Sequence, residues 1–217
     1  MGKDRDALIA GGVTGASITV LMNAYDRAMY LHVVHQRHFL NPRNWTNPTH
    51  GMSMALISRT VNFGFYHSSV DIIRKKYDER GYPKQCKSIA TGVITGTMTS
   101  MIRNPFNVIK FSQWNNHKNV DKEIKHIVGD IHNNYSYRWM IRGYGAIWMR
   151  DVITSTTYVQ LRSMLIDDCD RDNPLLNVTT SFVSAAVGTA LSSPFNYLKN
   201  IRYHDMHKGI DRSYGDI

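Results

Sequence analysis

The sequence predicts an all-α membrane protein built from tandem two-helix repeats, with five membrane-spanning helices. The chain of 217 residues carries 26 Lys and Arg against 17 Asp and Glu, yet charge is absent from three long windows: Ala7 to Tyr25, Ser88 to Ile102 and Asn173 to Leu198. The mean hydropathy of −0.34 conceals this uneven distribution. Long uncharged stretches and an internal repeat are together typical of membrane helices in a repeat architecture.

The first half of each repeat is predicted to be a helix with small residues on one face. Aligning Ala24, Pro105 and Pro194 brings four columns into register, two before the aligned residue and two after it. The small residues stand nine and thirteen positions before the aligned residue: Gly15 and Gly11, Gly96 and Gly92, Ala185 and Ser181. Small residues four apart lie on one helix face, where they let a neighbouring helix approach closely.

The second half of the repeat is found twice. Gly51 precedes Tyr66 by the same interval that separates Gly143 from Tyr158, and this register places Ser58-Arg59 on Arg150-Asp151. The chain ends too soon after Lys199 for another span. We therefore expect two complete repeats of two helices, residues 1–81 and 82–172, and a partial third repeat of one helix and a tail, residues 173–217.

The aligned prolines and the polar residues after them predict a gate. Proline removes a backbone hydrogen bond, so Pro105 and Pro194 are expected to kink their helices. The polar positions two and five residues beyond the aligned site form a ring at one depth: Asp26, Asn107, Lys110, Asn196 and Lys199. In that ring we expect an ion pair between Lys199 and Asp26, and a charge-assisted hydrogen bond between Lys110 and Asn196.

Ionisable residues inside the predicted spans indicate a polar interior. Each costs about 2.5 to 3.5 kcal/mol on insertion scales, so Arg59, Arg150 and Asp151 are expected to face the interior of the bundle. They either bind an anion at mid-depth or form an internal salt bridge that fixes helix packing. Asp71 and Arg74, three residues apart, form either a second gate on the opposite side or a solvated helix end.

These residues resemble the mitochondrial carrier family, whose odd helices carry Pro-x-[Asp/Glu]-x-x-[Lys/Arg] and whose even helices end in an aromatic-acid-x-x-basic motif. The resemblance extends from about Asp6 to Arg202 and covers five of the six helices of that family. It implies a pseudo-three-fold helical barrel in the mitochondrial inner membrane, with a central site opened alternately to each side. It also implies substrate contacts at Ser58-Arg59 and at Arg150-Asp151, and places the ring of Lys110 and Lys199 on the matrix side.

The chain departs from the family pattern at several positions. Ala24 replaces the first proline, Met29 the first basic residue, and Asn107 and Asn196 two acids. With no sixth helix expected, the chain is a degenerate carrier, a carrier completed by a partner chain, or the product of a truncated reading frame. Frequent Asn, Ile, Tyr and Lys suggest an AT-rich genome, and such carriers are similar to those encoded by large DNA viruses, which would use the host mitochondrion.

The resemblance and the basic interior together predict transport of an anionic solute, without a cofactor. A nucleotide or other phosphorylated metabolite, moved by exchange, is the first expectation, and an amino acid or carboxylate is the alternative. A non-transporting membrane adaptor is a third interpretation. Membrane lipid, cardiolipin included, is the other expected partner.

Other classes of protein find less support in the sequence. No local motif indicates a catalytic triad or a phosphate-binding loop, so we do not expect an enzyme. His32, His35 and His38 lack further ligands for a metal, and the two cysteines, Cys86 and Cys169, have no metal-binding spacing. A nucleic-acid interface would use a basic patch in one connector, though no nucleic acid is expected as a partner: Lys118, Lys122, Lys125, Arg138 and Arg142.

Overall fold

The computed structural model confirms the all-α class. It describes residues 2–115, 126, 128–129, 132–133, 143–167 and 174–210, and this part of the chain contains no strand. The elements are α1 (Gly2–His35), the 3₁₀ helix η1 (Pro42–Asn44), α2 (Met52–Asp78), α3 (Lys84–Asn115), α5 (Tyr144–Asp167) and α6 (Pro174–His207). Five of the helices in these described residues are long: α1, α2, α3, α5 and α6.

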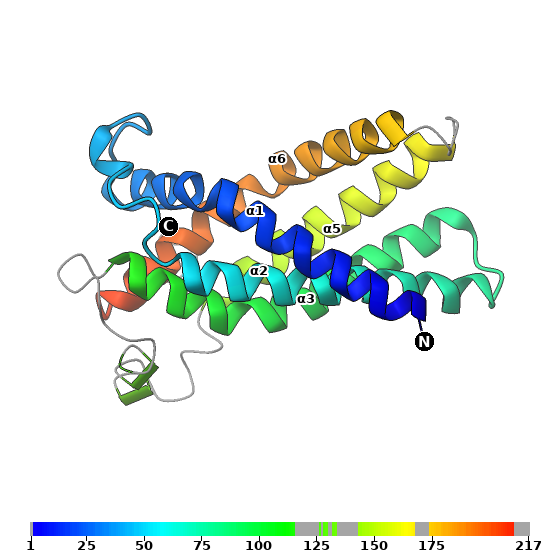
Figure 1. Cartoon of the computed structure of the whole chain (residues 1–217), viewed down its shortest axis with the longest axis horizontal. Coiled ribbons are helices and arrows are strands. Elements are labelled where there is room, and N and C mark those ends of the chain that lie inside the picture. The colour runs from blue at the N-terminus through cyan, green and yellow to red at the C-terminus, as the bar shows by residue number, and fades with distance from the viewer. Residues whose placement is uncertain are drawn as a thin grey trace.

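The long helices pack against one another in chain order, α1 on α2, α2 on α3, α3 on α5 and α5 on α6 (Figure 1). The contact between α1 and α6 is much smaller. It involves their C-terminal halves, where Tyr30, Leu31 and Tyr203 belong to one core cluster, while Figure 1 shows their N-terminal halves well apart. The helices therefore form an arc that is joined at one end and open along a seam between α1 and α6.

Glycines allow the helices of each complete repeat to approach closely. A Cβ atom on Gly92 would lie 2.3 Å from the Cα of Thr156, and one on Gly96 would lie 2.7 Å from the Cα of Val152. Gly15 of α1 meets the backbone of α2 in the same way, at 2.6 Å from a carbonyl oxygen. Only a residue without a side chain fits at such crossings. The small-residue face is confirmed at these three positions.

The third repeat uses its small residues differently. Gly188 is the point of close approach between α6 and α5, because a Cβ there would lie 3.0 Å from the Thr154 carbonyl oxygen. Ala185, which occupies the column of Gly96, is exposed. Within the part of the chain that the structure describes, no helix therefore covers Ala185 in the way that α5 covers Gly96.

Away from the aromatic core, many small polar side chains lie in the interior and many large apolar side chains lie on the outside. Interior positions hold Thr19, Asn23, Thr91, Thr95 and Ser184, each at most 2% exposed. Large apolar side chains cover the outside, among them Leu21 (77%), Val13, Met101, Leu175 and Phe182. Soluble proteins bury such residues in their cores and leave polar ones in water. An apolar exterior around a polar interior is the arrangement that a lipid environment favours.

Of the described helices, α6 alone is long and apolar enough by composition to cross a membrane. The qualifying stretch is Leu175–Asp205, with a mean hydropathy of 1.3. The other long helices carry more polar and charged residues, several of which face the interior of the bundle. The five-span carrier barrel therefore stays a prediction.

An aromatic cluster forms the joined end of the bundle, hereafter the closed end. Phe111 stacks on Tyr203 with ring centroids 4.7 Å apart, and Tyr30 and Trp114 pack against the same ring at 4.7 and 5.1 Å. This cluster joins the C-terminal halves of α1, α3 and α6. Pro105 and Pro194 lie inside α3 and α6, which both continue beyond them, and the expected kinks stay predictions.

Candidate anion-binding site

A cluster of buried and half-buried charges lies between the helices and draws on all five of them. Its acids are Asp26 of α1 and Asp151 of α5. Its bases are close enough to interact electrostatically with these acids or with one another: Arg59 of α2, Arg103 and Lys110 of α3, Arg150 of α5 and Lys199 of α6. Five basic side chains face two carboxylates, so this charge cluster has a formal excess of three positive charges.

Asp26 is paired with Arg59 in the neighbouring helix. The Arg59 guanidinium donates from Nη2 to the Asp26 carboxylate and from Nη1 to the carbonyl of Ile18 at 2.9 Å. The sequence analysis predicted Lys199 as the partner of Asp26, and that prediction was wrong. The reason is the close packing of α2 on α1 at Gly15. This packing brings Arg59 next to Asp26, so Arg59 takes the place that was predicted for Lys199.

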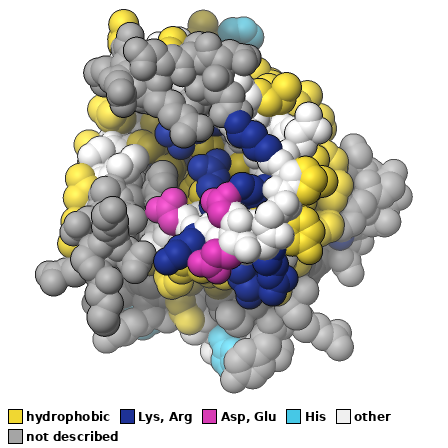
Figure 2. Space-filling view, turned by 90° about the vertical axis from the view of Figure 1, so that its right-hand side faces the viewer, with side chains coloured by type: hydrophobic (Ala, Val, Ile, Leu, Met, Phe, Trp, Pro, Cys, Tyr) yellow, Lys and Arg dark blue, Asp and Glu magenta, His cyan; other side chains and the backbone are white. Residues whose placement is uncertain are grey.

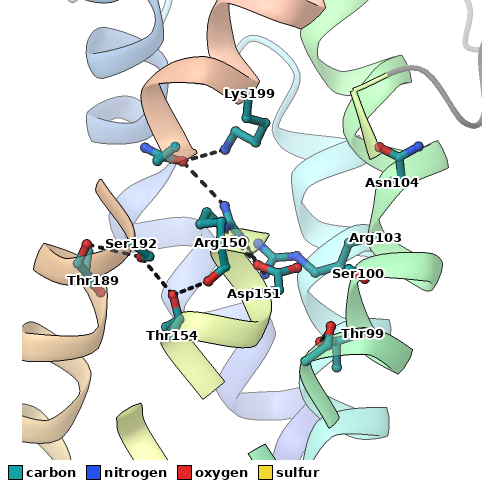
Figure 3. A network of polar contacts seen from close by, with 12 residues as sticks. Thr99, Ser100, Arg103, Asn104, Arg150, Asp151, Thr154, Thr189, Ser192 and Lys199 are labelled. Atoms are coloured by element: carbon teal, nitrogen blue, oxygen red, sulfur yellow. Dashed lines mark hydrogen bonds and ion pairs between the residues drawn. The ribbon is translucent and has the colours of Figure 1, made fainter. Parts of the chain in front are cut away.

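Asp151 is held by two arginines from different helices. Its Oδ1 accepts hydrogen bonds from Arg150, at 2.8 Å from Nε, and from Arg103 of α3, at 3.3 Å from Nη1. Figure 3 shows Arg103 and Arg150 reaching Asp151 from opposite sides. The Asp151 side chain is 4% exposed, whereas Arg103 is 25% exposed. One arginine of this group therefore has a surface that a solute can reach.

The network continues from Arg150 to Lys199 through Asn196. The Asn196 Oδ1 accepts hydrogen bonds from Lys199 Nζ at 2.7 Å and from Arg150 Nη1 at 3.5 Å (Figure 3). Lys110, predicted to bind Asn196, instead places its ammonium over the rings of Phe111 and Trp114, 4.9 and 4.6 Å from their centroids. That prediction was also wrong, because cation–π contacts at the closed end hold the lysine.

Arg103 was missed by the sequence analysis. It interacts with Asp26 and Arg59 on one side and with Arg150 and Asp151 on the other, so it joins the two predicted contact pairs. A signal was present, because Arg103, Asn107 and Lys110 follow the i, i+4, i+7 spacing of one helix face. The residue was overlooked because it stands before Pro105, outside the carrier motif that was used to align the repeats.

The remaining predicted site residues lie above or beside this cluster. Ser58 is buried next to Arg59. Asp71 is exposed and Arg74 half-buried, one turn apart in the last part of α2, far along the helix from the closed end. Arg74 is close enough to Tyr66 to interact with it electrostatically, and the Tyr66 ring lies 6.4 Å from that of Tyr158. The two equivalent tyrosines of the repeat thus meet between α2 and α5.

The arrangement of the charge cluster suits the binding of an anion. Figure 2, seen from the end where α1 begins, shows Lys, Arg and acidic side chains gathered in a hollow with hydrophobic side chains around it. Charges in such a setting are weakly screened, so an excess of cations attracts anions strongly. Among the described residues, no group of His, Cys, Asp and Glu is arranged to hold a metal ion.

Comparison with protein-family models finds no match for this chain, and comparison with curated proteins finds none either. The fold and the charge cluster are therefore interpreted from the structure itself. The basic patch considered for nucleic acid lies outside the described residues: Lys118, Lys122, Lys125, Arg138 and Arg142.

Proposed function

We propose that this protein is a membrane-embedded carrier that binds an anionic solute in its central hollow and moves it across the membrane by alternating access. The observation that carries the proposal is the charge cluster. Five cations and two carboxylates from five helices converge in the interior of a bundle whose exterior is apolar. Burying uncompensated charge is costly, so a retained excess of cations is better explained by a ligand than by packing.

The bound solute would connect helices of the bundle to one another. Arg59, Arg103 and Arg150 lie on three different helices, and an anion between them would compete with Asp26 and Asp151 for their guanidinium groups. The energy of these new contacts would offset the loss of helix contacts when the aromatic cluster of the closed end separates. Transport then follows from a solute that binds the intermediate state better than either end state.

Phosphorylated solutes fit the cluster best. Three excess positive charges match a solute with several negative charges, and arginine forks bind phosphate oxygens in pairs. A nucleotide or other phosphorylated metabolite is therefore our first candidate, and an amino acid or carboxylate is the second. The mitochondrial inner membrane, cardiolipin contact and an exchange mode follow from the family resemblance and belong to the same proposal.

Uptake by proteoliposomes tests the proposal. The purified chain is reconstituted into liposomes preloaded with unlabelled nucleotide, and entry of labelled nucleotides, inorganic phosphate and dicarboxylates is measured. We expect saturable uptake of a phosphorylated anion that Arg103→Gln reduces at least tenfold. Lys87→Gln, which removes a pair with Asp78 between the ends of α2 and α3, should leave uptake unchanged. Absence of uptake for every anion would reject the carrier.

The seam supports a second candidate, a non-transporting membrane adaptor. Ala185 is exposed where the corresponding face of α3 packs on α5, so the described helices leave a helix-sized face free. A helix of another chain could bind there and either complete a barrel or form a stable complex without transport. Crosslinking from an Ala185→Cys variant in native membranes, combined with the uptake assay, distinguishes the adaptor from the carrier. An adaptor gives a defined protein adduct but no anion uptake.

A further inference from the structure

We propose that Lys110 and Lys199, together with Asn107, form a second anion subsite at the floor of the central hollow. This subsite would bind the distal charged group of a polyanion whose proximal group occupies Arg59, Arg103 and Arg150. The inference rests on the proposed function and specifies the solute: it must carry at least two anionic groups in line. The lysines would then act as ligands of the solute and would not be simple closing contacts of a gate.

The first support is the chemistry of the neighbouring positions. At two of the three positions where a gate would place acids, this chain has Asn107 and Asn196. The third position is Asp26, and its carboxylate is paired with Arg59. Lys199 donates to the Asn196 carbonyl oxygen, a neutral acceptor on its own helix, and Lys110 lies over aromatic faces. Neutral partners of this kind compete less strongly with an anionic ligand for the lysine side chains than a carboxylate would.

The second support is a buried donor without a partner. Asn107 is 2% exposed, and in the described part of the chain its Nδ2 finds no acceptor. A buried amide without a hydrogen bond costs about 1 to 3 kcal/mol, and a bound ligand is one of the ways in which such a group gains a partner. Asn107 lies on the helix face that also carries Arg103 and Lys110, so an anion at these bases would offer it an acceptor.

The third support is the arrangement of the lysines relative to the arginines. Lys199 shares the Asn196 oxygen with Arg150, so the subsite connects directly to the upper group of arginines (Figure 3). Lys110 and Lys199 both lie over the ring of Phe111, with centroid distances of 4.9 and 5.3 Å. Two ammonium groups on one aromatic ring repel each other, and a bound anion between them would relieve that repulsion.

Binding of linear phosphates of increasing length tests the inference. Calorimetric titration of the detergent-solubilised full chain would use orthophosphate, pyrophosphate and tripolyphosphate at fixed ionic strength. We expect affinity to rise with length. Asn107→Asp and Asn196→Asp supply nearby acids without changing side-chain shape, and each should weaken tripolyphosphate binding about tenfold, the effect of one lost charge-assisted contact. Orthophosphate binding, confined to the arginines, should change less than about twofold.

Further variants separate binding from stability. Lys199→Gln should weaken tripolyphosphate binding as the acid variants do, Lys199→Arg should restore it, and Lys87→Gln should match the wild type. The inference is overturned if affinity is independent of phosphate length, or if both acid variants raise the melting temperature and leave tripolyphosphate binding unchanged, which is the result for a simple gate. If no phosphate binds at all, the inference fails together with the choice of a phosphorylated solute, whereas the carrier itself is rejected only by the absence of uptake of every anion.

Discussion

Arg59 of α2 binds Asp26 of α1 and, through its other terminal nitrogen, the carbonyl of Ile18, about two turns earlier in the same helix. A single arginine thus ties two helices together beside the charge cluster. The Arg59 side chain is 17% exposed and that of Asp26 is 32% exposed, so neither group is fully enclosed by the protein. The pair can therefore stabilise the fold and respond to a solute.

A double-mutant cycle with Asp26→Asn and Arg59→Gln should reveal a direct coupling. We expect a coupling energy of about 0.5 to 1.5 kcal/mol, at the low end for contacting residues because water screens a partly exposed pair. The measurement is thermal or denaturant unfolding in detergent. The control cycle combines Asp26→Asn with Lys199→Gln, and a larger coupling in that cycle would support the gate pair that the structure does not show.

Gly96→Leu should prevent α3 and α5 from packing. Even a Cβ there would lie 2.7 Å from a backbone atom of α5, so the helices must separate, at a cost of more than about 3 kcal/mol. The yield of folded protein and its melting temperature report the effect. Ala185→Leu is the matched control, because this residue has the same place in the repeat but is exposed, and a melting temperature lowered as much as by Gly96→Leu would contradict the open seam.

Tyr203→Phe should loosen the closed end. The Tyr203 hydroxyl donates to Asn104 Oδ1 at 2.6 Å, and its loss removes this bond between α6 and α3 at a cost of about 1 kcal/mol. Tyr197→Phe, at an exposed site on the same helix, should be neutral. Unfolding curves of the wild type, Tyr203→Phe and Tyr197→Phe measure these effects. Equal stability of Tyr203→Phe and the wild type would show that the hydrogen bond does not stabilise the closed end.

Arg103→Lys should bind phosphate less well than wild type, although the charge is kept. The planar guanidinium can donate to Asp151 and to a solute oxygen at the same time. The lysine ammonium is a compact group without this planar fork, so it cannot make both contacts in the same geometry. We expect a loss of roughly fivefold to fiftyfold in affinity, comparable to one bidentate contact. Titration of both proteins with pyrophosphate measures this. Unchanged affinity would show that Arg103 serves only as a partner of Asp151.

The helices could be predicted from the sequence because their signals are local or repeated. Uncharged windows located α3 and α6, and the shared interval from Gly51 to Tyr66 and from Gly143 to Tyr158 located α2 and α5. Glycine spacing also predicted which helix faces approach closely. A face of small residues allows close approach whichever helix packs against it.

The charge partners could not be predicted in the same way. Repeat symmetry suggested that Lys199 would meet Asp26, but the pair that forms depends on how near each helix lies, and α1 has its close crossing with α2. The position of Lys110 depends on the rings of Phe111 and Trp114, which the repeat columns do not include. The partner of each charged side chain thus depends on how the helices pack in three dimensions. The spacing of residues along the sequence does not give this information.

The most direct test of the central claim, a wet cationic hollow inside an apolar shell embedded in a membrane, is thiol accessibility in proteoliposomes. Cysteine replaces Asn62, three residues beyond Arg59 and buried in the bundle, or Val178, which is 67% exposed on α6, in a chain freed of its native cysteines. We predict that a charged, membrane-impermeant thiol reagent labels Asn62→Cys, that phosphorylated anions slow this labelling, and that Val178→Cys is labelled only by a lipid-soluble reagent. Rapid labelling of Val178→Cys by the charged reagent, with Asn62→Cys inaccessible, would contradict the claim.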